Sequence, residues 1–236
     1  MEIIDIHTHM LFGVDDGAAD METSLALLDK AYKEGTRRIF FTPHSIDGRF
    51  NFEGANRSLE KLVTAARERY PELKFSGGCE LYYSESAVDG LLQGKVPTLA
   101  DSKYVLVEFH PTVCYFDLKN AIQKLTVSGF IPIIAHAERY GCLRKESTEH
   151  LVELGAYIQL NARSVLGKSG FEPKQFCKKL LKSGLVHFIA SDAHDLKRRS
   201  SGLSDCVKHI EKKYSQKYAE RIFYKNPMKI LNNTYI

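Results

Sequence analysis

The chain has 236 residues, 44% of them hydrophobic, and a formal net charge of +4 at pH 7. This length and apolar content are enough to bury one large α/β core, and no segment has the composition of a linker, so we expect a single domain over residues 1–236. The weak net charge excludes the strongly basic balance of a nucleic-acid binder.

The composition also indicates the cellular compartment of the protein. No apolar run approaches the roughly 18 residues that span a bilayer, and the first residues lack the basic and apolar regions of a signal peptide. The five cysteines are odd in number, scattered and without a C-x-x-C pair, which is typical of reduced thiols. We therefore expect a cytoplasmic protein without a disulfide framework and without membrane insertion.

Short, almost continuous apolar runs alternate with helical patterns along the chain. In chain order, the predicted strands are residues 2–6, 38–41, 74–77, 104–109, 131–135, 157–160 and 187–190. The predicted helices between them are residues 24–33, 55–69, 118–126, 148–154 and 173–181, followed by further helix from 205 to 231. Four glycines each follow a helical pattern, as helix C-caps require: Gly35, Gly129, Gly155 and Gly184.

Four of the predicted strands end in residues of the metal-ligand type. His7 and His9 close the first strand, and side chains at i and i+2 of a strand point to the same face. Asp192 and His194 repeat this spacing late in the chain. His44 and His136 follow two of the strands between them. A single histidine on a strand is more often a core residue, but two such pairs at strand ends indicate a metal site.

Carboxylates also lie at or near the ends of predicted strands. Glu80 comes soon after the third predicted strand, and Glu108 lies within the fourth, where an unpaired charge is rarely buried. Asp15 and Asp16 precede Gly17 in the loop after the first strand, where a turn or cap role competes with a ligand role.

The architecture follows from where these residues lie. Parallel strands buried on both faces read as continuous apolar runs, and seven βα units suit either a barrel or an open doubly wound sheet. Ligands in an open sheet concentrate at a switch point, whereas here they follow strands from one end of the chain to the other. We therefore predict a distorted, TIM-like (β/α)7 barrel with the site at the C-terminal ends of its strands.

Two basic features lie close to these ligands in sequence. Arg139 comes three residues after His136, and its guanidinium matches phosphate oxygens bidentately. The run from Lys197 to Arg199 begins three residues after His194, so we expect it to overhang the mouth, where it is either a solvated face or a site for an acidic substrate.

Together these residues resemble the polymerase and histidinol phosphatase (PHP) superfamily. More narrowly, the chain is similar to the manganese-dependent protein tyrosine phosphatases of Gram-positive capsule and exopolysaccharide loci. The likeness runs from Met1 to about Asn232, and the matching segments are residues 5–9, 14–17, 42–44, 80–83, 107–109, 135–140 and 190–194. Typical histidinol phosphatases of the superfamily have histidines where this chain has Asp16 and Glu108, which favours the narrower family.

The resemblance implies a PHP-type barrel with up to three divalent ions, Mn²⁺ before Fe²⁺ or Zn²⁺. By this likeness one ion takes His7, His9, Glu80 and Asp192, a second takes Glu80, Glu108 and His136, and a third takes Asp16, His44 and His194. The choice of Asp16 over Asp15 rests on the resemblance alone. Imidazoles and carboxylates without a thiolate suit a harder ion, and ions that outweigh the carboxylates attract a phosphate dianion.

The expected reaction is attack of an activated water on a phosphotyrosine, with Arg139 and Asp16 as catalytic residues. A cysteine nucleophile is excluded, because no cysteine has an arginine six residues later. The resemblance further implies that the substrate is the tyrosine-rich tail of a membrane-associated kinase regulating polysaccharide export. A phosphatase for small phosphomonoesters such as histidinol phosphate, an inactive binding module and a nuclease remain alternatives.

Overall fold

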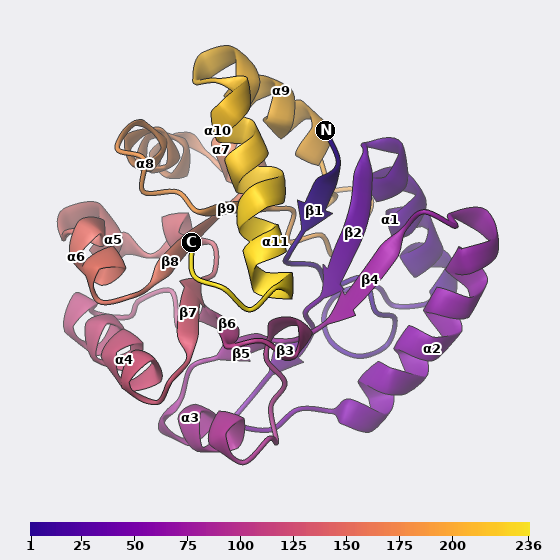
Figure 1. The fold of residues 1–236 in the computed structure, drawn as a ribbon, viewed down its shortest axis with the longest axis horizontal. Helices are drawn as coiled ribbons and strands as arrows, with labels where there is room; N and C mark the ends of the chain where they lie inside the picture. The colour runs from indigo at the N-terminus through magenta and orange to yellow at the C-terminus, as the bar shows by residue number, and fades with distance from the viewer.

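The structure, a computed structural model that describes residues 1–236, contains nine strand segments alternating with helices (Figure 1). Every pairing between them is parallel. The segments are β1 (Ile3–Asp5), β2 (Thr36–Phe41), β3 (His44–Ser45), β4 (Lys74–Gly77), β5 (Glu80–Tyr82), β6 (Tyr104–Glu108), β7 (Ile131–Ile134), β8 (Tyr157–Asn161) and β9 (Phe188–Ala190).

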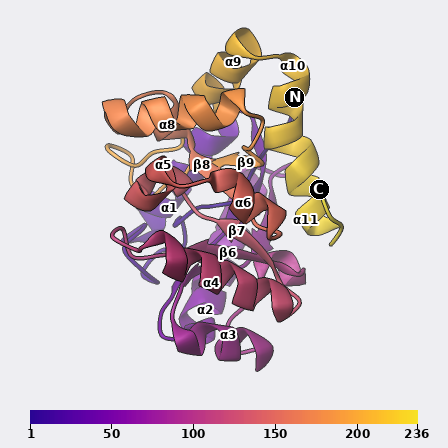
Figure 2. The ribbon, with the colours of Figure 1, turned by 90° about the vertical axis from the view of Figure 1, so that its left-hand side faces the viewer.

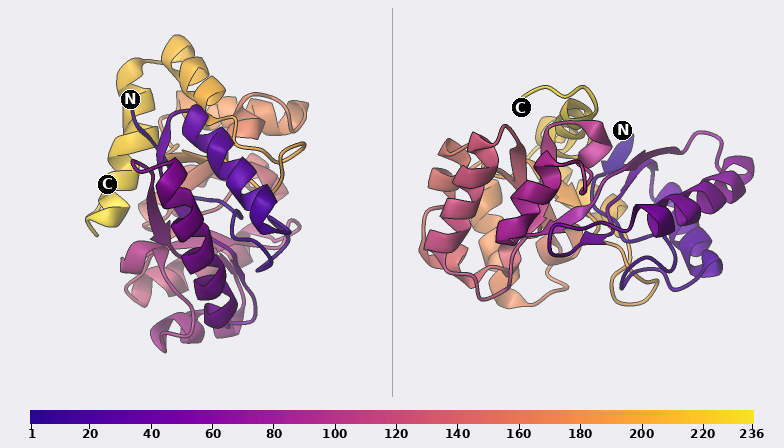
Figure 3. Two further views of the ribbon diagram at one scale, coloured as in Figure 1. Left: turned by 90° about the vertical axis from the view of Figure 1, so that its right-hand side faces the viewer. Right: turned by 90° about the horizontal axis from the view of Figure 1, so that it is seen from below.

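Helices surround the strands on the outside (Figures 1 and 3). They are α1 (Met21–Lys33), α2 (Phe52–Arg69), α3 (Glu85–Leu92), α4 (Tyr115–Val127), α5 (Gly141–Lys145), α6 (Thr148–Glu153), α7 (Ala162–Val165), α8 (Phe171–Lys182), α9 (Leu203–Lys213), α10 (Gln216–Glu220) and α11 (Asn226–Leu231). The 3₁₀ segments η1 (Leu99–Asp101) and η2 (Ala137–Arg139) and the π-helical η3 (Arg221–Lys225) complete the chain. None of the helices combines the length and the apolar character needed to cross a bilayer.

The five helices predicted between strands are all present, but most begin earlier than the apolar pattern indicated. α1 starts at Met21 because the Asp20 side chain accepts a hydrogen bond from the backbone N–H of Thr23, and Asn51 caps α2 in the same way. The four predicted C-cap glycines all have a positive φ. Helix α3 was not predicted, because its short apolar stretch has no long period to reveal it.

Two of the predicted strands, residues 38–41 and 74–77, are each followed after a two-residue break by a short strand that was not predicted. β2 and β3 are separated by Thr42 and Pro43, and β4 and β5 by Gly78 and Cys79. Strands β2 and β4, before the breaks, belong to one sheet in the order β1-β2-β4. Strands β3 and β5, after the breaks, begin a second sheet in the order β3-β5-β6-β7-β8-β9. Pro43 has no N–H to donate to a neighbouring strand, which fits its place at a break.

The last strand returns to the first, which makes the arrangement a ring. Thr8 and Ala193 form a parallel bridge just beyond β1 and β9. There the backbone N–H of His9 donates to the oxygen of Ala193 at 2.9 Å, and that of Asp192 donates to the oxygen of His7 at 2.9 Å. The strands therefore follow one another around the ring in chain order, as a distorted barrel requires and an open doubly wound sheet does not.

The interior of the ring is filled by alternate residues of the strands. Ile4, Ile6, Leu106 and Ile133 belong to one buried cluster, which Ile230 of α11 also joins. Helix α11 runs across the end of the ring where the strands begin (Figure 1), and Figure 3 shows both termini on that side. The loops that follow the strands are left at the opposite end, where the candidate site lies.

His187, just before β9, predicts how stability depends on pH. Its Nδ1 accepts a hydrogen bond from the backbone N–H of Ile158 at 3.1 Å, and burial, together with Arg221, lowers its pKa to about 4. A neutral histidine of this kind stabilises the fold above pH 6.5, and this contribution is lost as the pH falls from 6.5 toward 4. We expect wild type to lose about 2 kcal/mol more stability than His187→Gln between pH 7 and pH 4.5.

Urea unfolding at both pH values measures this difference. The exposed His110→Gln variant serves as the control and should follow wild type. Equal losses in wild type and His187→Gln would contradict the assignment of His187 as a half-buried neutral imidazole.

Candidate metal centre

All nine residues predicted as metal ligands converge at the mouth of the ring. They come from the ends of strands or the loops just after them, as parallel strands place them. They form four overlapping groups, and within each group one ligand atom per residue lies within 4.8 Å of the others. The groups are His7, His9 and Asp192; His7, Glu80 and His136; His44, Glu80 and Glu108; and His9, Asp16, His44 and His194.

The innermost group is held by His7 and His9. Their Nε2 atoms are 3.2 Å apart, and each lies 3.1 Å from Oε2 of Glu80. Oδ1 of Asp192 is 3.5 Å from His7 Nε2 and 3.7 Å from His9 Nε2. All four side chains are at most 2% exposed, so this cluster of nitrogen and oxygen atoms is shielded from bulk water.

Acceptors behind the two rings determine their tautomers. Nδ1 of His9 lies 2.6 Å from Oδ2 of Asp15, and Nδ1 of His7 lies 3.2 Å from Oε1 of Gln159. The amide of Gln159 is oriented by two further bonds, because its Oε1 accepts from the backbone N–H of His136 and its Nε2 donates to Asn161. Each Nδ1 therefore carries the hydrogen, and each Nε2 presents a lone pair to the cluster.

This geometry fits a bound cation. Two lone pairs and two carboxylates face one another in a buried space, and without positive charge they repel. Burial opposes protonation of His9, yet its hydrogen bonds to Asp15 and Glu80 raise its pKa to about 10, as expected where carboxylates surround an imidazole. Nε2 of His194 is buried with no hydrogen-bond partner. A set of imidazoles and carboxylates without a thiolate suits a hard or borderline divalent ion.

The remaining contacts extend the cluster on two sides. Nε2 of His136 lies 2.8 Å from Oε1 of Glu80 and 3.3 Å from Oε1 of Glu108. Oδ1 of Asp16 lies 3.3 Å from Nε2 of both His44 and His194. His136 has a φ of 32° and Asp192 a φ of 53°, left-handed conformations that non-glycine residues rarely adopt and that cluster at functional sites.

The structure separates the roles of Asp15 and Asp16, which the residues alone left open. Asp15 turns away from the imidazole Nε2 atoms: it accepts from Nδ1 of His9 and from the backbone N–H groups of Gly17 and His44, and its pKa is lowered to about 2 despite burial. Asp16 instead faces the ligand group, with its side chain 59% exposed. Asp15 thus orients His9, and Asp16 is the ligand candidate.

Gly17 allows this loop to approach so closely. A Cβ atom at residue 17 would lie 1.9 Å from the backbone oxygen of His9, so no larger residue fits without moving the strand end. The backbone N–H of Ala18 donates to that same oxygen at 3.0 Å.

We predict that Asp15→Asn lowers kcat for the expected reaction, hydrolysis of a phosphotyrosyl peptide, about 10- to 100-fold while leaving the fold intact. The amide keeps the volume but weakens the hydrogen bond that holds the His9 tautomer. Titration of the metal-stripped protein with Mn²⁺, followed by activity and calorimetry, measures the effect, with exposed Asp47→Asn as the control. Unchanged metal affinity and kcat would contradict the orienting role.

Two arginines complete the wall of the cluster. The Arg139 guanidinium contacts Oδ2 of Asp192, and its Nη1 lies 3.7 Å from Oε1 of Glu108. Arg199 Nη2 lies 2.9 Å and 3.0 Å from the two Asp192 oxygens, and its Nη1 is 3.5 Å from Asp16. The guanidinium groups are about one third exposed, so they border both the cluster and the solvent.

Three site residues were not predicted individually. Arg199 belongs to the basic run that we expected over the mouth, but its pairing with Asp192 is set by the turn that Asp195 caps through the backbone N–H groups of residues 197–199. Gln159 and Asn161 are buried at the end of β8, and Asn161 Nδ2 donates to Asp192 at 2.7 Å. Polar residues in a buried strand were the available signal for both.

A ring of parallel strands with imidazoles and carboxylates clustered at its C-terminal mouth is the arrangement typical of α/β-barrel metallohydrolases. Residues 3–232 match the model of the family described as capsular polysaccharide synthesis, CpsB/CapC. The chain belongs to this family.

Named relatives are similar in sequence to this chain over most or all of its length. The tyrosine-protein phosphatase CpsB of Streptococcus agalactiae is 34% identical over 99% of this chain and 100% of its own, and that of Streptococcus pneumoniae is 35% identical over 97% and 98%. The tyrosine-protein phosphatase YwqE of Bacillus subtilis is 32% identical over 90% of this chain and 85% of its own.

Solved structures are also similar to the structure of this chain. One, from a study of YwqE from Bacillus subtilis and CpsB from Streptococcus pneumoniae that describes them as unique metal-dependent tyrosine phosphatases, has a TM-score of 0.88 at 30% identity, covering 99% of this chain and 96% of that one. A phosphotriesterase homology protein from Escherichia coli has a TM-score of 0.64 at 13% identity and covers 98% of both chains, a likeness of fold alone.

Proposed function

We propose that this protein is a metal-dependent protein tyrosine phosphatase. The observation that carries the proposal is the convergence of nine imidazole and carboxylate side chains into one cluster at the mouth, bordered by two arginines. The whole-length similarity to named tyrosine-protein phosphatases supports it.

We assign metal ligation to the nine residues in three sets, of which the first two share Glu80. His7, His9, Glu80 and Asp192 form the first, Glu80, Glu108 and His136 the second, and Asp16, His44 and His194 the third. Mn²⁺ is the ion that we propose, because the donor set is hard to borderline. Bound divalent ions supply Lewis acidity and lower the pKa of water toward neutrality.

The side chains of the protein then bind and orient the substrate. Arg139 and Arg199 offer guanidinium groups to the phosphoryl oxygens, where charge accumulates as water attacks phosphorus in line with the departing tyrosine oxygen. Asp16 lies at the exposed rim, and we assign to it both metal binding and assistance to the departing phenolate. Tyrosine is a tolerable leaving group because its pKa is near 10.

The proposed partner is the tyrosine-rich tail of a kinase in the cytoplasm, acting in polysaccharide synthesis. The family description, capsular polysaccharide synthesis, supports this setting. All five cysteines are unpaired, and three of them are buried with a raised pKa, which suits a metal-based rather than a thiolate-based reaction.

The decisive experiment assays metal-stripped protein for phosphate release from a phosphotyrosyl peptide, with and without Mn²⁺. We expect activity to return with Mn²⁺ in wild type and to stay absent in His136→Ala. Histidinol phosphate is assayed in parallel, and a higher kcat/KM for it would replace the tyrosine assignment by the small-phosphomonoester alternative. Metal binding without hydrolysis of either substrate would favour the binding module.

A further inference from the structure

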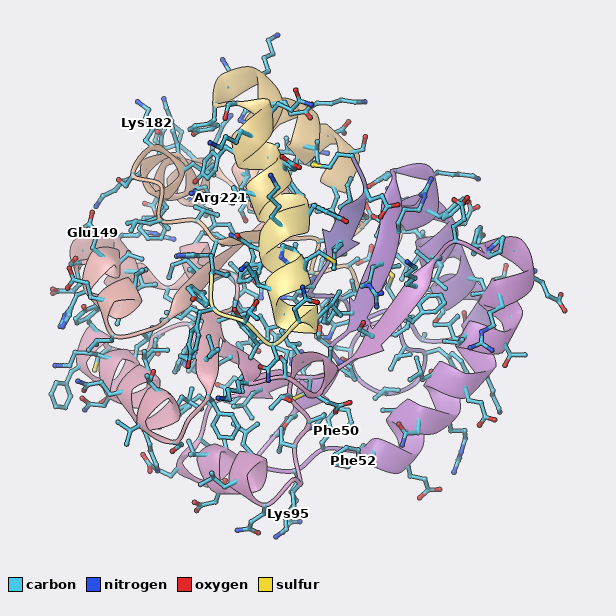
Figure 4. The ribbon with its side chains drawn as sticks, viewed as in Figure 1. Phe50, Phe52, Lys95, Glu149, Lys182 and Arg221 are labelled. Atoms are coloured by element: carbon cyan, nitrogen blue, oxygen red, sulfur yellow. The ribbon has the colours of Figure 1, made fainter.

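A groove of about 440 Å³ lies between α8 and α9, outside the site at the mouth. Figure 2 shows these two helices together at one end of the molecule, and Figure 4 labels Lys182 at its periphery. Five basic side chains line the groove, and we call it the basic groove: Lys174, Lys178, Lys182, His209 and Lys213. The apolar or aromatic residues Val165, Leu181 and Tyr214 also line it, and no carboxylate does.

The positive charge of the basic groove is not neutralised within the protein. The ion-paired lysines are Lys33, Lys124 and Lys225, all elsewhere. The only acidic residue of α8, Glu172, pairs with Arg144 at 2.7 Å.

Neighbouring positive charges also repel one another inside the groove. Lys174, Lys178 and Lys182 are spaced four residues apart on one face of α8, where like charges are unfavourable. Burial lowers the pKa of His209, and so do Lys213 and Lys174. A bound anion would relieve this repulsion.

Basic residues also occur in the segments that lie between the groove and the metal centre. Lys174 packs against Gly167, where a Cβ atom would lie 2.7 Å from its Cδ. The next residue, Lys168, donates its backbone N–H to the oxygen of Arg163 at 2.9 Å, and the Arg163 guanidinium donates to the backbone oxygen of Arg198. Arg199 then contacts Asp192 in the metal centre.

We propose that the basic groove docks an acidic segment of the phosphoprotein substrate while its phosphotyrosine occupies the metal centre. This inference rests on the proposed function. The basic residues between the groove and the metal centre favour one chain that reaches both sites, and the concave shape favours an extended peptide over a flat membrane surface.

The test compares two variants that each lose three lysine charges. The groove variant is Lys174→Gln/Lys178→Gln/Lys182→Gln, and the control is Lys179→Gln/Lys208→Gln/Lys212→Gln on the same two helices but outside the groove lining. The substrates are phosphotyrosyl peptides that carry, after Gly/Ser spacers of several lengths, a run of glutamates or a matched run of glutamines. p-Nitrophenyl phosphate reports the chemistry alone.

We expect the groove variant to raise KM for the glutamate peptide about 5- to 10-fold with kcat unchanged. The glutamine peptide and p-nitrophenyl phosphate should be hydrolysed as by wild type, and the control variant should match wild type throughout. The preference of wild type for the glutamate peptide should fall as salt is raised.

Unchanged KM for the glutamate peptide at every spacer length would overturn the proposal. If the groove variant also bound phosphatidylserine vesicles more weakly than wild type, the groove would be assigned to a membrane surface instead. Fluorescence anisotropy with an unphosphorylated glutamate peptide tests docking directly. Docking by wild type, lost in the groove variant, would support the groove even if no phosphotyrosyl peptide were hydrolysed and the proposed function failed.

Discussion

Glu80→Gln is expected to lower kcat for a phosphotyrosyl peptide about a thousandfold, equivalent to about 4 kcal/mol in the activation barrier. Glu80 is 1% exposed and its carboxylate lies 3.1 Å from both His7 and His9 and 2.8 Å from His136, so it is shared by two of the proposed metal sets. The amide keeps the shape but removes the charge that a shared cation requires.

Metal content and thermal stability show whether the loss arises as proposed. Mn²⁺ should raise the Tm of wild type, because it binds only the folded state, and should raise that of Glu80→Gln much less. Exposed Glu85→Gln, which loses an ion pair with Lys124, is the control and should retain activity and metal. Full metal occupancy with normal kcat in Glu80→Gln would refute the assignment of Glu80 as a bridging ligand.

Arg139→Ala is expected to lower kcat about 100- to 1,000-fold, with a smaller change for Arg139→Lys. The guanidinium borders both Asp192 and the solvent-facing side of the mouth, where a phosphoryl group would enter. Lysine restores the charge but not the planar, bidentate geometry, so it should recover only part of the rate.

Inhibition by inorganic phosphate separates two roles for Arg139. Weaker inhibition in Arg139→Ala, with Mn²⁺ affinity unchanged, is the result we expect for a residue that contacts the phosphoryl group. Loss of Mn²⁺ affinity with unchanged phosphate inhibition would show instead that Arg139 only positions Asp192. The exposed Arg57→Ala variant, which breaks a surface pair with Glu53, should behave as wild type.

Local pattern was enough to predict the strands but not their interruptions. Residues 104–109 and 131–135 read as strands because buried parallel strands need continuous apolar runs, and β6 and β7 lie there. β3 and β5 were missed, because segments of two and three residues have no measurable period. Both begin at ligand candidates, His44 and Glu80, so the breaks in the strands lie directly before the site.

The sequence by itself determined the chemistry of the centre: strand-end imidazoles and carboxylates without a thiolate, at spacings that send neighbouring ligands to one face. Only the tertiary structure decided which atoms meet. Asp15 and Asp16 are adjacent and chemically identical, and their roles differ because the close approach at Gly17 turns one toward His9 Nδ1 and the other toward His44 and His194. Arg199 and the basic groove likewise depend on contacts between distant segments, which no local spacing encodes.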